Sequence, residues 1–142
     1  MKKLSFAALL LSLSAAAFAG PADDARAHFA AIGAGDVDKV MGAYAEQASF
    51  DWIGGPLDGR YSGAKDIRAL WEKFAKAQGT LKVSVDKVEE AANPKGSTVT
   101  ANVLFEGKQP IKVRYVLVYR DGKIVGETWQ IAPALAVAAS GS

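Results

Sequence analysis

The only histidine of the sequence, His28, combines a reactive ring with a position that is expected to be buried. It lies at helical spacing from Ala25 and Ile32, on the apolar side of a predicted helix. Because an imidazole titrates near neutral pH in water, a histidine there could act as an acid, a base or a hydrogen-bond donor in a pocket. The alternative is a structural imidazole bonded to a backbone carbonyl. His28 is therefore a candidate catalytic residue.

Glu127 is the second candidate catalytic residue, and it lies in a segment that alternates like a β-strand. Val125, Trp129 and Ile131 share its face, which predicts that this face is turned to the core. A carboxylate there would lose hydration and could serve as an acid or a base. The alternatives are a salt bridge with Arg114 or Lys112 on a neighbouring strand, or a solvated position at the edge of the sheet.

Large aromatic side chains on inward faces could shape a pocket for a flat apolar ligand. Core packing is the alternative role for each of them. The candidates of this kind are Tyr44, Trp52, Trp71 and Trp129.

Several other chemistries are disfavoured by the residues that the sequence lacks. One histidine and no cysteine argue against zinc and haem sites of the usual kinds. The chain has no glycine-rich phosphate loop and no G-x-S-x-G motif. We therefore expect no metal and no cofactor.

The first 19 residues have the pattern of a secretory signal peptide. Lys2 and Lys3 precede an apolar run, and Ala17-Phe18-Ala19 fits the pattern that signal peptidase cleaves. We predict cleavage after Ala19, a periplasmic or secreted location, and no membrane association of the mature protein. Of the 17 Lys and Arg residues, two lie in the signal, and the other 15 balance the 15 Asp and Glu residues. A neutral mature chain gives no argument for a nucleic-acid partner.

The remaining chain reads as helices first and strands afterwards, which predicts an α+β fold. The first helix is expected to begin at Pro21 and to end at Gly33 and Gly35. Asp36 caps a short second helix with Tyr44 on its apolar face. A third helix covers about 64–77. The glycine-rich segment 54–63 is expected to be a loop. Strands are predicted over 48–53, 81–88 with a bulge near Lys87, 98–105, 111–119 and 124–131, and the Asp121-Gly122 pair predicts a hairpin turn.

This arrangement resembles the nuclear transport factor 2-like superfamily, which includes SnoaL-like proteins and ketosteroid isomerase. The segments that carry the resemblance are Ala34-Gly35-Asp36, Tyr44-Ala45-Glu46, Tyr61-Ser62-Gly63, Ile67-Arg68 and Asp121-Gly122-Lys123-Ile124-Val125. It covers roughly residues 24–131. It implies a cone in which a curved sheet wraps around three N-terminal helices and leaves an apolar pocket at one end. It implies function weakly, because the superfamily contains both enzymes and binding domains.

Comparison with ketosteroid isomerase identifies further pocket candidates and one difference. The base aspartate of that family falls on Trp52, and Asp51 is one residue early, so it should face the other side of the strand. The family's two hydrogen-bond donors fall on His28 and Tyr115, which can both donate. The resemblance therefore adds Tyr115 to the ligand-binding candidates, while the expected base is missing.

We interpret residues 20–131 as one SnoaL-like domain, followed by a mobile tail over 132–142. The predicted function is binding of a small apolar or aromatic molecule. The alternatives are an acid–base enzyme of isomerase, dehydratase or cyclase type using Glu127 or His28, and a protein-interaction domain. The strand over 111–119 is apolar on both faces near its end, which predicts a homodimer through the sheet face.

Overall fold

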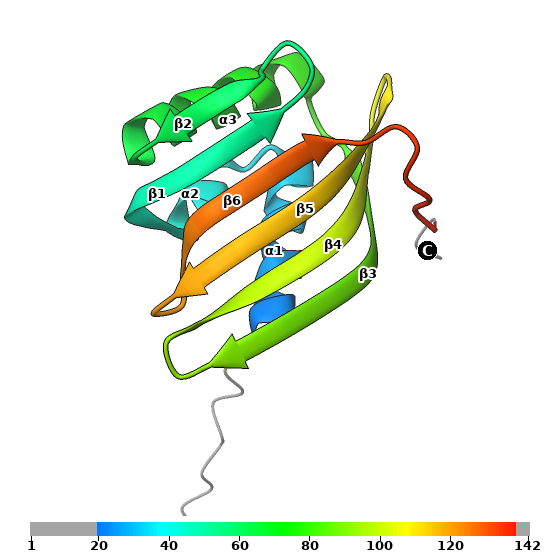
Figure 1. Cartoon of the computed structure of the whole chain (residues 1–142). Helices are drawn as coiled ribbons and strands as arrows, with labels where there is room; N and C mark the ends of the chain where they lie inside the picture. Colours follow the sequence, from blue (N-terminus) through cyan, green and yellow to red (C-terminus); the bar gives the residue numbers. More distant parts are fainter. Residues whose placement is uncertain (1–19, 139–142) are drawn as a thin grey trace, which may run out of the picture.

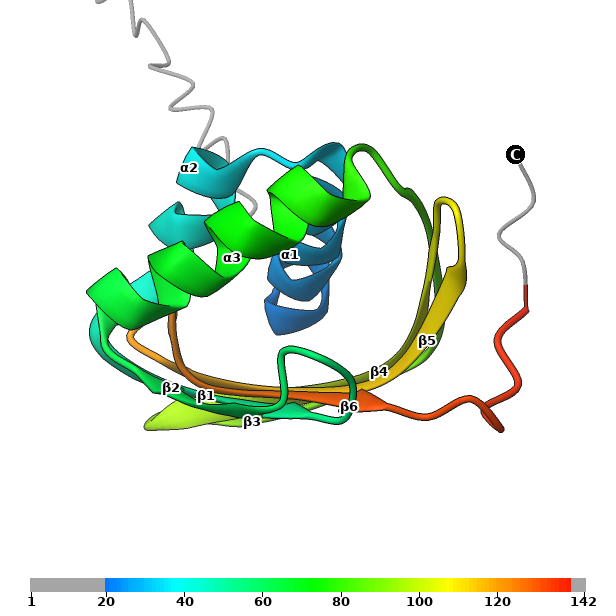
Figure 2. The ribbon, with the colours of Figure 1, turned by 90° about the horizontal axis from the view of Figure 1, so that it is seen from above.

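The computed structural model describes residues 20–138 of the chain, so the predicted signal peptide lies outside the described residues. Three helices cover the concave face of one curved six-stranded sheet (Figures 1 and 2). The elements are α1 (Pro21–Ala34), α2 (Val37–Gly42), β1 (Tyr44–Ile53), β2 (Gly59–Ser62), α3 (Ala64–Gln78), β3 (Lys82–Asn93), β4 (Gly96–Glu106), β5 (Pro110–Arg120) and β6 (Lys123–Ile131). The predicted α+β cone is confirmed.

The strand order of the sheet is β2-β1-β6-β5-β4-β3, and β1 and β6 run parallel while all other neighbours are antiparallel. The last strand of the chain thus lies in the middle of the sheet, beside the first long strand. This crossover places Phe50 and Trp52 of β1 directly beside Glu127 and Trp129 of β6. Residues that are far apart in the sequence therefore meet on one concave surface.

The core lies between this concave surface and the helices, and strict alternation along β4 and β5 fills it. Every second residue of these strands points inward, as period-two patterning requires. The inward residues, each at most 1% exposed, are Val99, Ala101, Val103, Phe105, Val113, Tyr115 and Leu117. The inward face of α3 contributes Ile67, Leu70, Trp71 and Phe74, in the spacing expected of an amphipathic helix.

The helix ends follow from local residue types. Pro21, Asp23 and Asp24 occupy the first turn of α1, and Gly35 ends the helix in the left-handed conformation with φ 69°. The side chain of Asp36 caps α2 by accepting a hydrogen bond from the backbone N–H of Lys39 at 3.2 Å. The predicted helix end at Gly35 and the predicted cap at Asp36 are confirmed.

Gly33, which was expected to end the first helix, lies inside α1 instead. Its backbone carbonyl accepts a hydrogen bond from Leu81 N–H at 2.7 Å, just before β3. A Cβ atom at this position would lie 2.3 Å from Val83 Cγ2 and 2.9 Å from the Leu81 carbonyl oxygen. The glycine is thus explained by the close approach of a strand rather than by a turn.

Three expectations about individual positions are wrong. Tyr44 is the first residue of β1 and not the end of the second helix, and the expected loop over 54–63 contains the short strand β2. In β6, Ile124 is fully buried and Val125 only half-buried, the reverse of the expectation. A register shift between Val118 and Tyr119 of the neighbouring strand inserts one extra residue there, which exchanges the two faces.

The outer face of the sheet carries an uncharged patch, defined here by Thr98, Thr100, Val116, Val118 and Thr128. These residues are cross-strand neighbours and none is buried.

We propose that a second copy of the chain covers this outer patch. The double variant Val116→Lys/Val118→Lys should then sediment as a folded monomer, whereas Ala92→Lys, at an exposed site on β3, should not change the assembly. A wild-type protein that sediments as a monomer at high concentration would disprove the dimer.

The segment 132–138, which comes after β6 in the chain, makes two hydrogen bonds to the sheet and one within itself. Ala132 N–H donates to the Lys112 carbonyl at 2.9 Å, Leu135 N–H to the Ala132 carbonyl at 3.0 Å, and Ala138 N–H to Asp86 Oδ2 at 3.1 Å. The mobility predicted for residues 132–142 stays a prediction, and residues 139–142 lie outside the described part of the chain.

Candidate functional site

The structure brings the two candidate catalytic residues into direct contact, although they are separated by 99 positions in the sequence. His28 Nε2 lies 2.8 Å from Glu127 Oε2, and both side chains are fully enclosed. The hydroxyl groups of Tyr44 and Tyr115 donate to Oε1 and Oε2 of the same carboxylate. We call these four residues the Glu127 cluster. Its single carboxylate accepts hydrogen bonds from three different elements besides its own strand.

A fifth residue extends the Glu127 cluster by one hydrogen bond. Trp71 Nε1–H, from α3, donates to the hydroxyl oxygen of Tyr44 at 2.8 Å. That hydroxyl therefore accepts from an indole while it donates to Glu127, an arrangement in which the two hydrogen bonds polarise one another. The network connects α1, β1, α3, β5 and β6, so it ties the helices to the sheet.

Burial and the nearby carboxylate both act on the tyrosines of the cluster. Loss of hydration raises the pKa of Tyr44 well above its ordinary value, and the charge of Glu127 raises it further. The same two causes, in the same order, raise the pKa of Tyr115. Both phenols are thus held in the protonated form, in which they can donate to Glu127.

The other ring nitrogen of His28, Nδ1, is buried and has no hydrogen-bond partner within residues 20–138. A histidine that donates from Nε2 to a carboxylate leaves Nδ1 available as an acceptor in the neutral ring. His28 also contributes to the wall of a small cavity of about 200 Å³ near Lys39 and Lys123. The Glu127 cluster is therefore closest to the surface on the α1 side.

A layer of stacked aromatic rings lies on the other side of the Glu127 cluster. Trp129 stacks between Trp52 and Phe105, with ring centroids 4.2 Å and 4.9 Å apart and interplanar angles of 16° in both cases. Phe74 and Trp71 meet Trp129 edge to face. Trp129 also contacts Tyr115, at 5.7 Å between centroids. The layer thus separates the polar cluster from the space beyond Trp52.

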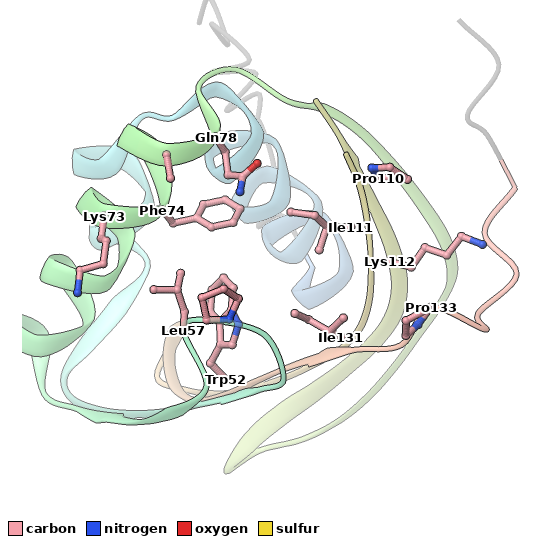
Figure 3. Close-up of a pocket in the computed structure, with 12 residues that line it drawn as sticks. Trp52, Leu57, Lys73, Phe74, Gln78, Pro110, Ile111, Lys112, Ile131 and Pro133 are labelled. Carbon is pink, nitrogen blue, oxygen red and sulfur yellow. The ribbon is translucent and has the colours of Figure 1, made fainter. Parts of the chain in front are cut away.

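That space is a cavity of about 540 Å³ between α3, the β1–β2 loop and the ends of β5 and β6 (Figure 3). Most of its wall is apolar and comes from Trp52, Leu57, Phe74, Ile111, Ile131 and three prolines. The polar members are Lys73, Gln78 and Lys112. Its size lies within the range of pockets that bind small molecules, about 300–1,000 Å³.

Neither His28 nor Glu127 lines this cavity. Of the five predicted ligand-binding residues, Trp52 forms part of its wall, whereas Trp71 and Trp129 lie behind it and Tyr44 and Tyr115 belong to the Glu127 cluster. The indole nitrogen of Trp52 is buried without a partner in the part of the chain that the structure describes.

A model of the SnoaL-like domain family matches residues 25–127. The chain belongs to this family. No curated protein matches the sequence. Solved structures with the same fold include a candidate calcium/calmodulin-dependent protein kinase type II association domain from Thiobacillus denitrificans, at 21% identity and TM-score 0.67, with 79% of this chain and 94% of that chain covered.

Two further structures of the same fold come from the nuclear transport factor 2-like (NTF2-like) family. A candidate dehydratase from Streptomyces avermitilis is 17% identical, with TM-score 0.66 and coverage of 78% of this chain and 92% of that one. A protein of unknown function from Pseudomonas putida is 14% identical, with TM-score 0.66 and coverage of 84% and 91%. At such identities the likeness establishes the fold alone.

Asp51 of this SnoaL-like domain faces away from the cavity, as the strand alternation predicts. Its carboxylate accepts a hydrogen bond from Arg60 Nε at 2.8 Å across the β1–β2 pair, and both side chains are solvent-accessible. The hydrogen bond from Arg60 lowers the pKa of Asp51. Arg114, one of the two alternative partners of Glu127, bonds Asn102 instead, at 3.0 Å. Lys112, the other, forms no ion pair with Glu127, whose charged partner among residues 20–138 is His28.

Sequence reasoning missed most of the cavity wall. Phe74 had a signal, because it lies on the apolar stripe of α3. Ile111 and Ile131 are at strand ends, where alternation indicates a face but not an opening. Leu57 lies in a segment that reads only as a turn, so its sequence carries no sign of a wall.

No group of three or more His, Asp or Glu side chains in residues 20–138 is placed to hold a metal ion. In the same residues no helix combines the length and apolar character needed to span a bilayer.

Proposed function

We propose that this SnoaL-like domain binds a small apolar or aromatic molecule in the cavity bounded by Trp52, Leu57 and Phe74. The observation that carries the proposal is the cavity itself, about 540 Å³ of mostly apolar wall at the open end of the cone. Apolar surface that is left unfilled in water favours a ligand that can cover it. The single polar side chains at the wall would orient such a ligand.

The packing behind the cavity supports a binding role. The ring of Trp52 stacks on Trp129 on the side away from the cavity, and Trp129 contacts Tyr115 of the Glu127 cluster edge to face. A network of mutual hydrogen bonds restricts the rotamers of the residues that it joins. We infer that the cluster holds the aromatic layer in place, so that the cavity is formed before the ligand arrives and little ordering entropy is lost on binding.

The uncharged dye N-phenyl-1-naphthylamine tests this proposal, because its fluorescence rises when it enters an apolar site. We expect saturable binding by the wild type. Ala77, an exposed residue of α3, contributes to the cavity wall, and Ala77→Trp should weaken binding at least about tenfold by filling the space.

Ala69→Trp is the matched control, because Ala69 is an exposed residue of the same helix that does not line the cavity. This variant should bind the dye as the wild type does. Circular dichroism of both variants checks that the fold is retained. The absence of saturable binding by the wild type, or equal binding by the two variants, would reject the cavity as the binding site.

Acid–base catalysis by Glu127 and His28 is the second candidate function, and their direct contact favours it. It requires a substrate to reach the carboxylate. The aromatic layer lies between the cavity and the Glu127 cluster, and three donors already occupy Glu127. An enzyme of this kind must therefore open the aromatic layer or admit its substrate through the small cavity beside His28, which a binding domain need not do.

A further inference from the structure

We propose that the ligand of the cavity is uncharged and carries an amide edge, a C=O beside an N–H, on its apolar or aromatic body. This inference rests on the proposed function and adds the polar group of the ligand to it. It comes from Gln78, an uncharged polar side chain of the cavity wall whose amide has no partner in the part of the chain that the structure describes.

Gln78 is the last residue of α3, and its side chain is half-buried. Figure 3 shows this side chain extending into the space between Phe74 and Ile111. Its amide group makes no hydrogen bond with any residue between 20 and 138. A carboxamide has two N–H donors on its nitrogen and an acceptor on its oxygen. The wall therefore presents a free donor and a free acceptor side by side.

The charged residues of the wall do not direct their charges at the cavity. Figure 3 shows the side chains of Lys73 and Lys112 extending away from it. Lys112 alternates along β5 with the fully buried Val113, which places it on the outer face of the sheet. The wall contains no acidic residue. An ionic ligand would thus be buried against an apolar wall without a counter-charge, which is costly, so the ligand that fits is uncharged.

A second uncharged donor belongs to the same wall. Trp52 is 4% exposed, and its indole nitrogen is buried without a partner among the residues described. Its ring lies 5.5 Å from that of Phe74 between centroids, and Phe74 precedes Gln78 by one turn of α3. Unpaired donors therefore outnumber unpaired acceptors in this part of the wall. The group that uses surplus donors is a carbonyl, whose oxygen has two lone pairs.

A ligand that fills the cavity displaces water from the amide of Gln78. A hydrocarbon would leave both ends of that amide unpaired, and an unpaired polar group that loses its water reduces affinity. A ketone or an ester would pair the nitrogen but not the oxygen. An amide edge pairs both, because its C=O accepts from Gln78 Nε2 and its N–H donates to Gln78 Oε1. The matching class of ligand is therefore a lactam or carboxamide on an apolar ring system.

Three compounds with two fused rings test the inference: 2-quinolone has the amide edge, 1-methyl-2-quinolone lacks its N–H, and 2-methylnaphthalene has no polar group. Each is titrated as a competitor of N-phenyl-1-naphthylamine at neutral pH. The measured quantity is the ratio of 2-quinolone affinity to the affinity of each other compound. When this ratio is compared between two proteins, differences in hydrophobicity between the compounds cancel.

Gln78→Met removes the amide and keeps an unbranched side chain of similar size. We expect the ratio of 2-quinolone to 2-methylnaphthalene affinity to fall about tenfold in this variant, and the ratio to 1-methyl-2-quinolone to fall about threefold. Gln78→Leu, a second variant without the amide, should lower both ratios in the same way. Gln47→Met is the matched control, because Gln47 is an exposed glutamine of β1 outside the cavity wall. It should leave both ratios unchanged, and circular dichroism checks the fold of every variant.

The outcomes separate this inference from the proposed function. If the dye binds the wild type and both ratios are the same in Gln78→Met as in the wild type, the cavity binds apolar molecules and the inference about the amide edge is wrong. It is wrong also if Gln47→Met lowers the ratios as much as Gln78→Met does. A fall in the first ratio without a fall in the second would show that the cavity selects an acceptor alone. If the dye does not bind the wild type at all, the proposed function itself fails.

Discussion

Replacement of Glu127 by glutamine should lower the free energy of unfolding at pH 7 by about 2–3 kcal/mol. Glutamine has nearly the same shape, so the change leaves no cavity. It removes the negative charge that receives hydrogen bonds from Tyr44, Tyr115 and His28, and such charge-assisted bonds are about twice as strong as neutral ones. The amide group of glutamine would also point a donor at a site where all three neighbours donate.

Urea unfolding followed by circular dichroism measures this effect. Glu89→Gln is the matched control, because Glu89 is an exposed residue of β3 and its replacement should change stability by less than about 0.5 kcal/mol. A Glu127→Gln protein as stable as the wild type would show that the Glu127 cluster does not stabilise the fold. A variant more stable than the wild type would indicate a carboxylate retained for catalysis at the expense of stability.

Dye binding by the same variant separates the two candidate functions. A domain that only binds its ligand should retain affinity in Glu127→Gln at temperatures where the variant is folded, because the carboxylate does not line the cavity. An enzyme that depends on this carboxylate would bind but lose turnover. The pair of measurements, stability and binding, is therefore more informative than either one.

The sequence indicated which faces are buried, but it did not indicate which buried residues meet. Strand alternation placed Glu127 on the inner face, and helical spacing did the same for His28, and both predictions hold in the structure. Their contact depends on the curvature of the sheet and on the parallel pairing of β1 with β6, which are long-range properties. No local pattern encodes the distance between two residues on different elements.

The cavity was harder to predict than the polar cluster. Trp52 and Trp129 are neighbours in register on adjacent strands and have the same kind of surroundings in the sequence. One borders open space and the other fills the layer behind it, because Phe105 stacks on the far side of Trp129 only. Which aromatic residue lines a cavity is thus decided by the packing of the third neighbour, on a strand that is distant in the sequence.

Local irregularities of the strands explain the remaining differences between the predicted and the observed sheet. The bulge near Lys87 was predictable from the break in alternation and is present, with a register shift between Asp86 and Glu89. The bulge at Val125 was not predictable, because both Ile124 and Val125 are apolar β-branched residues. When either residue can fill the core, the pattern cannot decide which one does.

At alkaline pH the protein should lose stability steeply, by about 4 kcal/mol between pH 9 and pH 11.5 from two tyrosines alone. The pKa of Tyr44 and that of Tyr115 are raised well above 10 in the folded protein, first by burial and then by the charge of Glu127. In the unfolded chain both phenols ionise near pH 10. The unfolded state therefore releases protons that the folded state retains, and its free energy falls as the pH rises.

The direction of the effect follows from this difference in proton binding. Below pH 10 both states keep the phenols protonated, and the tyrosines contribute their full stabilisation. Above pH 10 each tyrosine costs about 1.4 kcal/mol of stability per pH unit, until the pH reaches its raised folded value. Tyr115→Phe removes one of these groups. This variant should be about 1–3 kcal/mol less stable than the wild type at pH 8, because Glu127 loses a donor, but the gap should close by about 2 kcal/mol at pH 11.5.

Tyr119→Phe separates ionisation from hydrogen bonding. The hydroxyl of Tyr119 is buried and has no hydrogen-bond partner among the residues described, so its removal should cost little at pH 8. Burial is also the main cause that raises the pKa of Tyr119, followed by the charges of Asp24 and Glu127. The variant should therefore be more stable than the wild type at pH 11.5.

Urea midpoints at pH 8, 10, 11 and 11.5 measure the stability of all three proteins. They share the same lysines and hence the same background of lysine deprotonation. If the pH dependence of the wild type and both variants is parallel, these phenols ionise as freely in the folded protein as in the unfolded chain. That result would contradict the rise in their pKa that burial causes.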